Sequence, residues 1–321
     1  MAKKILITGA GGFVGRHLIR ALQVAGETEI YGNVYSAKSD LVELIPSSYI
    51  LPADLTDYAA TAKLIADLSP DLIYHLASLS VVHNSGEQAG KILTNNLALQ
   101  YNLLESVRQS APKARIIAIS SGNVYGDAAA EFIPMSETCP LRPLNPYAVS
   151  KLNQEFLSLQ YHLAYGLDIV LLRPFNHTGA GQTTDFIVPM LGKQFVDIKN
   201  GAEPVITLGN LDSQRDFTDV RDMCDAYILA AKHAIAGEVY NIGSGVGTSI
   251  GDIIKVLEEL TGQAVEVKID ESKVRDSDVP ILVCDSTKFR SLTNWSPKFS
   301  LRDTLKSVLD FCSKQTYKET R

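Results

Sequence analysis

The sequence predicts an α/β protein in which a doubly wound parallel sheet is joined to a smaller α/β C-terminal domain. Short apolar runs alternate with helical patterns over roughly the first 170 residues, the order that produces parallel strands connected by helices. These runs lack the alternation with polar residues that marks half-exposed strands, so each strand is expected to be covered on both faces. The first run leads through a glycine-rich turn into a helical pattern.

The first domain is predicted to contain at least five strands with helices between them. The strands span residues 4–8, 29–34, 72–77, 114–120 and 167–173. The helices span 14–24, 58–69, 90–110 and 146–165. Apolar residues in the helical segments recur at the spacing of one helix face, whereas the strands are short and apolar throughout.

Beyond Arg173 the pattern changes to loops and shorter elements. Residues 175–182 are predicted to form a loop, and 201–219 is rich in turns, with short strand candidates. A helix at 220–234 and a strand at 238–242 are expected to rejoin the first sheet. A helix at 250–261, a strand at 265–269 and a final helix at 300–313 complete the predicted elements.

Composition narrows the class of protein. The 321 residues are 45% hydrophobic and 21% charged, with a net charge of −6, as in a soluble globular protein without the basic surface that binds nucleic acid. The four cysteines have no Cys-x-x-Cys spacing, so neither zinc nor a disulfide framework is expected. With no apolar run of ~18 residues and no signal peptide pattern at Met1, we expect a cytoplasmic protein without membrane contact.

The turn after the first strand predicts a dinucleotide site. Gly9, Gly12 and Gly15 follow a strand and open a helix, as in a Rossmann-type fold. Gly9 permits the tight turn, Gly12 lets a pyrophosphate approach the backbone, and Gly15 allows close packing of helix and strand. The free N–H groups at the start of the helix favour bound phosphate.

Two domains follow from this reading of the chain. We assign residues 1–175 plus 219–245 to the dinucleotide-binding domain and residues 176–218 plus 246–321 to a substrate domain. The active site is expected in the cleft between them, where ligands of doubly wound folds bind.

Tyr147 and Lys151 predict a proton-donor site. They lie four residues apart at the start of a predicted helix, so both side chains emerge on one face. A positive charge beside a phenol favours the tyrosinate, and we expect Lys151 to lower the pKa of Tyr147. Together with the glycine turn and the Ser120–Gly126 segment, this pair predicts hydride transfer at an alcohol carbon.

The Gly-x-x-Gly-x-x-Gly spacing and the Tyr-x-x-x-Lys pair resemble the extended branch of the short-chain dehydrogenase/reductase superfamily. The resemblance implies that Ser121 is catalytic with Tyr147 and Lys151, and that Asn96 orders a water near the lysine. Ser120 competes with Ser121, because adjacent strand residues point to opposite faces. The spacing to Tyr125 favours Ser121. For Asn96 a structural role is an equal alternative.

The same resemblance implies a set of cofactor contacts. Asp54 matches the carboxylate that meets the adenine amino group, although a loop carboxylate or a helix N-cap is the alternative. The implied contacts are Gly9, Gly12, Phe13, Val14, Gly15, Tyr35, Ser36, Asp54, Leu55, Leu76, Ala77, Ser78, Tyr147 and Lys151.

The end of the second strand favours NADP(H) over NAD(H). A carboxylate at this position grips the ribose hydroxyls of NAD and repels a 2′-phosphate. The chain has no carboxylate there before Asp40, and neutral Asn33, Tyr35 and Ser36, with Lys38 close by, tolerate a phosphate. The Arg that NADP-dependent relatives often carry at this position is missing.

Segments 173–182, 213–220 and 274–280 resemble the enzymes of this branch that act on nucleotide sugars, and the similarity spans nearly the whole chain. The resemblance implies reduction of a GDP-linked 4-keto-6-deoxy sugar to a GDP-6-deoxyhexose, with GDP-D-rhamnose favoured. It also implies a homodimer through helices 90–110 and 146–165. The alternatives are a dehydratase or epimerase on a related nucleotide sugar, and a catalytically silent dinucleotide-binding regulator.

The substrate diphosphate requires positive groups, which are scarce in an acidic chain. The resemblance implies Arg215 and Arg275 as phosphate ligands, with Asn176 donating a hydrogen bond nearby. Each arginine has a structural alternative. Arg215 could pair with Asp216 or Asp219, and Arg275 could be a solvated surface charge. Further implied substrate contacts are Gln182, Lys193, Asp278 and Ser121.

One local feature separates reductase from dehydratase. Sugar 4,6-dehydratases require a carboxylate base directly after the catalytic hydroxyl, and the resembling enzymes carry Glu or Asp-Glu there. This chain has Gly122 and Asn123, and Asp127 lies beyond the turn. The sequence therefore predicts a reductase.

Overall fold

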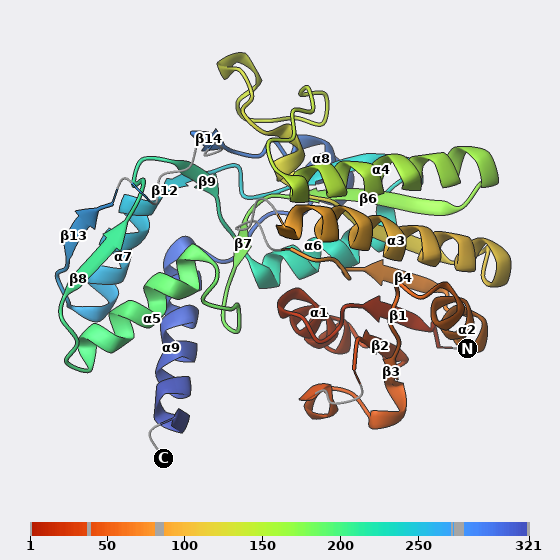
Figure 1. Ribbon diagram of the computed structural model, residues 1–321, viewed down its shortest axis with the longest axis horizontal. Helices are drawn as coiled ribbons and strands as arrows, with labels where there is room; N and C mark the ends of the chain where they lie inside the picture. The colour runs from red at the N-terminus through yellow and green to blue at the C-terminus, as the bar shows by residue number, and fades with distance from the viewer. Residues whose placement is uncertain (1, 37–39, 81–86, 271, 273–278, 320–321) are drawn as a thin grey trace.

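The computed structural model describes residues 2–36, 40–80, 87–270, 272 and 279–319 (Figure 1). Its centre is a seven-stranded sheet with the strand order β11-β6-β5-β4-β1-β2-β3, and every pairing within it is parallel. The strands are β1 (Ile5–Thr8), β2 (Ile30–Val34), β3 (Ile50–Pro52), β4 (Leu72–His75), β5 (Arg115–Ile119), β6 (Asp168–Pro174) and β11 (Val239–Ile242). The predicted doubly wound α/β fold is confirmed.

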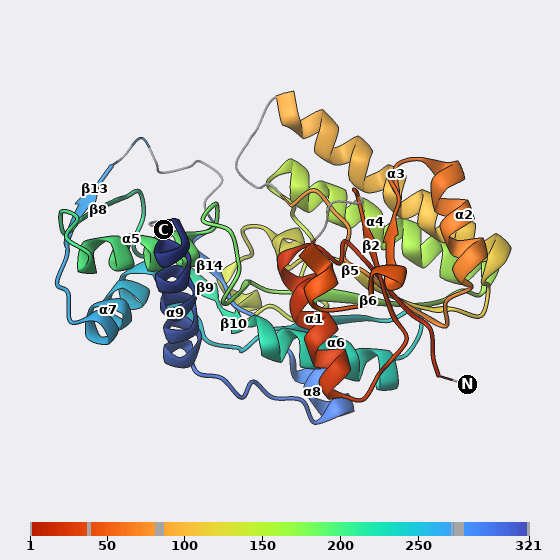
Figure 2. The same ribbon diagram turned by 90° about the horizontal axis from the view of Figure 1, so that it is seen from below.

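Two layers of helices cover the sheet, and Figure 2 shows them on opposite sides. One layer contains α1 (Phe13–Val24) and α6 (Val220–His233), and the other contains α2 (Tyr58–Leu68), α3 (Glu87–Ser110) and α4 (Pro146–Tyr165). Each layer encloses its own cluster of buried apolar side chains against the strands. The strands are therefore buried on both faces, which explains their unbroken apolar runs.

Helix α4 carries the Tyr-x-x-x-Lys pair, and its ends are set by local sequence. Asn145 is the N-cap, and its side chain accepts a hydrogen bond from the backbone N–H of Ala148 at 2.8 Å. Pro146 follows at a first-turn position, where the missing N–H costs nothing. Gly166 ends the helix with a φ of 70°, a conformation that glycine adopts without strain.

A second hydrophobic core lies beside the first. It is built from α5 (Ile187–Lys199), β8 (Val205–Leu208), α7 (Ile250–Thr261), β13 (Glu266–Ile269) and α9 (Leu301–Glu319). Helix α8 (Thr287–Thr293) belongs elsewhere, because Phe289 packs into the core that α1 and α6 share. The division into domains at 176–218 and 246–321 stays a prediction.

Short strands lie between the two cores. The strands are β7 (His177–Thr178) paired with β10 (Thr218–Asp219), and β12 (Gly247–Ser249), β9 (Gln214–Asp216) and β14 (Ile281–Leu282) in a three-stranded sheet. The 3₁₀ turns are η1 (Asp40–Glu43), η2 (Ser47–Tyr49), η3 (Gly122–Tyr125) and η4 (Ala130–Phe132). Among the helices of the described ranges, none is long and apolar enough to cross a bilayer.

Sequence patterns missed several elements, among them α5, β3 and α8. Helix α5 contains Pro189 and Gly192, residues that usually argue against a helix. Pro189 lies in the first turn, where proline is tolerated, and Gly192 faces α9 at close range. Strand β3 and helix α8 have only 3 and 7 residues, too few to show a period. The expectation of an unbroken loop over 175–182 was wrong at β7.

Gly192 offers a test of the second core. A Cβ at Gly192 would lie 2.6 Å from Cγ1 of Val308 on α9, whereas a Cβ at Gly90 on α3 would meet nothing within 4 Å. We expect Gly192→Ala to lower the midpoint of thermal unfolding. Overpacking a core costs ~1–3 kcal/mol, whereas the higher helix propensity of alanine over glycine stabilises by ~1 kcal/mol. The control Gly90→Ala should raise it slightly. Circular dichroism melts measure both, and equal shifts would contradict tight packing of α5 on α9.

Candidate active site

The glycine turn between β1 and α1 forms a cradle that side chains would fill. Gly9 has a φ of +66°, and a Cβ there would lie 3.0 Å from the backbone of Ala77. A Cβ on Gly15 would lie 2.6 Å from the carbonyl oxygen of Ala10. Gly12 is the N-cap of α1 and has no side chain to cap the helix, so its first N–H groups remain available. The turn fits a dinucleotide pyrophosphate.

Other predicted cofactor residues surround this cradle. Ala77 donates its N–H to Oγ1 of Thr8 at 3.2 Å, which holds the segment after β4 against the turn. Leu76 and Ser78 flank Ala77 on the same segment, and Phe13 and Val14 begin α1.

Asp54 is held in its loop by local hydrogen bonds. Its Oδ1 accepts from the backbone N–H of Thr56 at 2.9 Å and from the Thr56 hydroxyl at 2.7 Å. The N-cap of α2 is Asp57, which accepts from Ala60 N at 3.1 Å. Asp54 is thus a loop carboxylate rather than the helix cap, next to the buried Leu55. Contact with adenine stays a prediction.

The residues at the end of β2 differ in their exposure and contacts. The Asn33 amide is buried and donates to the carbonyls of Leu51 and Ala53, each at 3.1 Å, so it ties β2 to the segment of β3. Tyr35 and Ser36 lie beyond the strand with exposed side chains. Lys38 lies outside the described residues.

The predicted catalytic side chains meet at the end of β5. Ser121 caps the η3 turn directly after the strand and hydrogen-bonds the phenol of Tyr147. Lys151, one helical turn after Tyr147, donates from Nζ to the carbonyl of Ile119 at 2.8 Å. Its Nζ lies 5.8 Å from the centre of the Tyr147 ring. The catalytic roles of these three residues stay predictions.

The pKa values of the pair differ from the sequence-based expectation. Burial raises the pKa of Tyr147 to about 12, and the hydrogen bond from Ser121 opposes this rise. Burial lowers the pKa of Lys151 to about 7, against the charge of Glu155. The expectation that Lys151 lowers the pKa of Tyr147 was wrong for this structure, because desolvation outweighs the effect of a distant and partly neutral lysine.

Ser120 belongs to a different environment from Ser121. Its hydroxyl donates to the carboxylate of Glu155, which forms a fork-like pair with Arg173 at 2.7 Å and 2.9 Å. Both charged side chains are only 6% exposed. Arg173 also donates to the Tyr125 hydroxyl at 2.9 Å, and that hydroxyl donates to Asn241 at 2.7 Å. No sequence pattern indicated this network, although Glu155 lies one turn after Lys151.

Asn96 is buried and fully engaged with neighbouring groups. Its Oδ1 accepts from Leu79 N at 2.8 Å, and its Nδ2 donates to Leu79 O at 3.1 Å and to the Ser150 hydroxyl at 2.9 Å. These bonds fasten the loop after β4 to α4 beside Lys151. They establish a structural role, and the ordering of a water stays a prediction.

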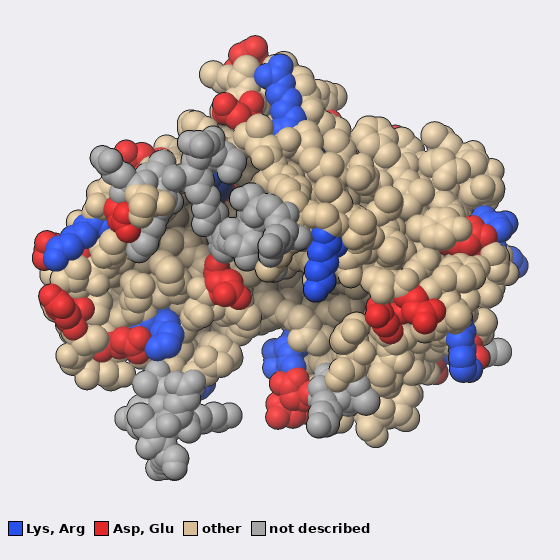
Figure 3. Space-filling model, in the orientation of Figure 1, with Lys and Arg blue, Asp and Glu red and all other residues tan. Residues whose placement is uncertain are grey.

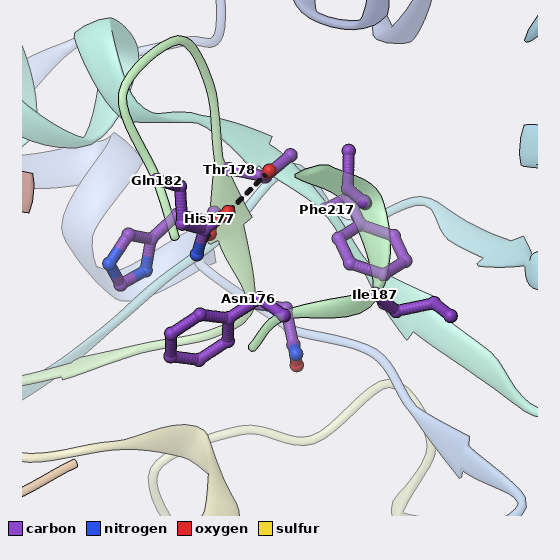
Figure 4. Close-up of a pocket in the computed structure, with 8 residues that line it drawn as sticks. Asn176, His177, Thr178, Gln182, Ile187 and Phe217 are labelled. Atoms are coloured by element: carbon purple, nitrogen blue, oxygen red, sulfur yellow. Dashed lines mark hydrogen bonds between the residues drawn. The ribbon is translucent and has the colours of Figure 1, made fainter. Parts of the chain in front are cut away.

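Two predicted substrate residues line one small cavity. Asn176 and Gln182 border a space of ≈ 40 Å³, and Figure 4 shows them with apolar side chains that line it. Gln182 accepts from the Thr178 hydroxyl at 2.6 Å and donates to His177 O at 3.3 Å. The remaining lining residues are Phe186, Ile187, Val188 and Phe217.

The other predicted substrate residues lie elsewhere. Lys193 lies on α5, outside the cavity lining, and pairs with Asp197 at 2.8 Å. Arg215 lies on β9 and donates to the carbonyl of Gln214 at 2.9 Å. The Asp219 carboxylate pairs with Arg221 and that of Asp216 accepts from Ser244, so both carboxylates suggested as partners for Arg215 have other contacts. Arg275 and Asp278 lie outside the described residues.

Contacts across the two cores join the glycine turn to the cavity. The ring of Phe13 stacks on His177, with centroids 6.4 Å apart and an interplanar angle of 6°. His17, one turn further along α1, donates from Nε2 to the carbonyl of Ala180 at 2.8 Å. The start of α1 therefore supports the loop that carries Gln182. In the described part of the chain, no group of acidic, His and Cys residues could hold a metal.

Comparison with known proteins shows the family to which the chain belongs. The family model of GDP-mannose 4,6 dehydratase matches residues 6–308, and the chain belongs to that family of short-chain dehydrogenase/reductase enzymes. The family and its relatives are nucleotide-sugar oxidoreductases and epimerases, so the chain is an enzyme of this class.

Individual relatives narrow the similarity. The GDP-6-deoxy-D-mannose reductase of Pseudomonas aeruginosa is 31% identical over 96% of this chain and 97% of its own. The GDP-6-deoxy-D-talose 4-dehydrogenase of Aggregatibacter actinomycetemcomitans is 31% identical over 92% and 93%. The structure of RMD from P. aeruginosa complexed with NADPH has a TM-score of 0.85 and 29% identity, covering 98% and 99%.

An epimerase structure matches equally well in fold. The Thermus thermophilus UDP-glucose 4-epimerase complexed with NAD has a TM-score of 0.85 and 26% identity, covering 96% of this chain and 98% of its own. Both structural relatives bind a nicotinamide dinucleotide, and the glycine cradle fits one. A nicotinamide dinucleotide cofactor is therefore supported for this chain.

Ser121 and Ser120 provide a paired test of the site. We expect Ser121→Ala to reduce turnover by roughly two orders of magnitude or more, because its hydroxyl contacts Tyr147. Ser120→Ala removes a bond to the buried Glu155 and should lower the unfolding midpoint while largely sparing turnover. Steady-state rates and thermal melts of both variants measure this. A matched loss of rate in the two variants would contradict the assignment.

Lys151 predicts a pH dependence of stability. The folded pKa is about 7 and the ordinary value is 10.5, so between these values the unfolded chain binds one more proton. The free energy of unfolding should therefore rise with pH across that window in the cofactor-free protein. Lys151→Met should flatten the rise. Urea unfolding of both proteins at pH 6.5 and 9 measures how the free energy of unfolding changes with pH. An equal change in the wild type and in Lys151→Met would contradict the low pKa of Lys151.

Proposed function

We propose that the protein reduces the 4-keto group of GDP-4-keto-6-deoxy-D-mannose with NADPH and produces a GDP-6-deoxyhexose, with GDP-D-rhamnose favoured. The observation that carries the proposal is the meeting of Ser121, Tyr147 and Lys151 at the end of β5, with no carboxylate in the two positions that follow Ser121. The two GDP-sugar relatives support the substrate class.

The positions after Ser121 cannot supply the base of a dehydratase. A Cβ at Gly122 would lie 3.0 Å from the ring of Phe175, so even a short side chain would crowd that ring. Asn123 has no titratable group. Asp127 is exposed beyond Gly126, which ends the η3 turn, and offers no buried carboxylate to the reacting carbon.

In the proposed mechanism NADPH, when bound, supplies the hydride that forms the new C–H bond at C4. The Ser121 hydroxyl donates a hydrogen bond to the substrate carbonyl and holds it beside Tyr147. The phenol, protonated at neutral pH, transfers its proton to that oxygen as the C=O bond becomes an alcohol. Lys151 donates from Nζ to the carbonyl of Ile119 at the end of β5, and we propose that it contacts the nicotinamide ribose from there.

We further propose that the cofactor preference is NADP(H), since β2 ends without a carboxylate and RMD binds NADPH. Asn176, Gln182, Lys193 and Arg215 are proposed to contact the GDP-sugar, together with Arg275 and Asp278. Of these, Asn176 and Gln182 already share a cavity.

A homodimer through α3 and α4 is also proposed. The two helices pack on each other and cover one face of the sheet (Figures 1 and 2). Their outer surface carries large exposed apolar side chains at helical spacing, Leu97 and Tyr101 on α3 and Phe156 and Leu163 on α4. Burial of such a patch against a second copy is favourable.

The function is tested with the 4-keto-6-deoxy sugar nucleotide. The wild-type protein should oxidise NADPH, and NMR of the product should show a retained C6 methyl group and one C4 configuration. Tyr147→Phe should lose ~10²–10⁴-fold in turnover while its affinity for NADPH is kept, because the phenol supplies the proton. More than half of the wild-type rate in this variant would refute the assignment.

The dehydratase alternative has its own assay. With GDP-mannose and oxidised cofactor in D₂O, we expect no exchange of the C5 hydrogen, because the base required for its removal is missing. Substantial exchange would replace the reductase proposal with a dehydratase.

A further inference from the structure

We propose that Arg16 recognises the 2′-phosphate of the cofactor and that Asp40 orients its guanidinium for this contact. The inference rests on the proposed NADPH dependence and names the residue that produces it. The sequence placed no arginine at the end of β2, where relatives often carry one. The structure supplies one from the neighbouring helix.

Arg16 is held at the rim of the glycine cradle. It follows Gly15 on α1, and its Nε donates to the carbonyl of Gly11 at 3.1 Å. Its terminal nitrogen forms an ion pair with Asp40, the first residue of η1. The Arg16 side chain is 25% exposed and that of Asp40 is 64% exposed, so the pair lies at the surface, with the arginine on the inner side.

The position of this pair matches the ribose end of a dinucleotide. Ala10 in the glycine turn donates its N–H to the carbonyl of Asn33 at 3.0 Å, so the turn and the end of β2 lie side by side. A pyrophosphate on the turn, with adenine near Asp54, would place the adenosine ribose between them. In folds of this type the group beside the end of β2 selects between NAD and NADP.

The chemistry of the pair favours a phosphate over bare ribose hydroxyls. A guanidinium has five N–H donors in a rigid fork, and Gly11 and Asp40 engage two of them. Arginine binds phosphate through two parallel hydrogen bonds. Asp40 lies beyond Val34, the last residue of β2, and Arg16 compensates its charge, so it differs from the strand-end carboxylate that repels a 2′-phosphate.

A single positive side chain matters for phosphate binding here, because the protein surface as a whole does not attract anions. The chain carries a net charge of −6, and Figure 3 shows positive and negative side chains scattered over the face that it displays. A phosphate is therefore drawn by a specific group rather than by a broad positive field.

The test uses cofactor fragments and needs no turnover. Isothermal titration of the wild-type protein with 2′,5′-ADP and with 5′-ADP should show at least tenfold tighter binding of 2′,5′-ADP. Arg16→Ala should weaken 2′,5′-ADP by tenfold or more and leave 5′-ADP within about twofold, since a charged hydrogen-bond pair is lost. Arg16→Lys should recover only part of the affinity, because lysine cannot form the fork.

Two further variants sharpen the test. Arg20→Ala removes an exposed positive charge one turn further along α1 and should leave both affinities unchanged. Asp40→Asn keeps an oxygen to orient Arg16 while removing a negative charge, so 2′,5′-ADP should bind at least as tightly as to the wild type. Circular dichroism confirms that each variant is folded.

The outcomes separate this inference from the proposed reaction. An unchanged ratio of the two affinities in Arg16→Ala would overturn the role of Arg16, even if the protein reduces the 4-keto sugar. Loss of 5′-ADP binding in Asp40→Asn would instead identify Asp40 as a ribose-binding carboxylate, which also overturns it. If Arg16→Ala weakens 2′,5′-ADP binding as expected but the wild-type protein does not reduce the 4-keto sugar, only the proposed substrate would be contradicted.

Discussion

The buried ion pair between Glu155 and Arg173 is the constraint on which the end of the sheet beside Ser121 and Tyr147 depends. It joins α4 to β6, while Ser120 and Tyr125 extend it to β5 and the η3 turn. Burial of two charges is costly, and removal of one partner leaves the other uncompensated at a cost of ~3–5 kcal/mol. The pair therefore holds α4 in one register against β5, and that register decides where Tyr147 and Lys151 lie.

A second set of contacts joins the glycine turn to the cavity lined by Asn176 and Gln182. Phe13 and His17 on α1 contact His177 and Ala180, which lie on the loop that carries Gln182. The first turn of α1 thus has two tasks, to present N–H groups to a pyrophosphate and to support the neighbouring loop. Glycines at Gly9 and Gly15 are required because the backbone of Ala77 and Ala10 lies too close for a side chain.

Prediction from sequence worked where one rule of periodicity governed an element. Helix α4 was predicted at its observed bounds, because Asn145 caps it and Gly166 ends it. Prediction failed at α5 because packing overrode local preference: the helix contains Gly192, which is required for the close approach of Val308. It failed at β3 for a different reason, since a strand of 3 residues is too short to show a pattern. The two carbonyls that the Asn33 amide meets could not be predicted, because a neutral side chain in sequence gives no sign of which backbone groups will approach it.

The sequence alone determined the α/β class, the glycine turn and the spacing that places Tyr147 and Lys151 on one helix face, because each depends on residues close in the chain. The tertiary structure decided the pKa values of Tyr147 and Lys151. Burial, a property of the whole fold, raises the pKa of Tyr147 and lowers that of Lys151. The tertiary structure also brought Arg16 to Asp40 and Glu155 to Arg173. No local sequence pattern encodes these contacts, because the paired residues lie on different elements.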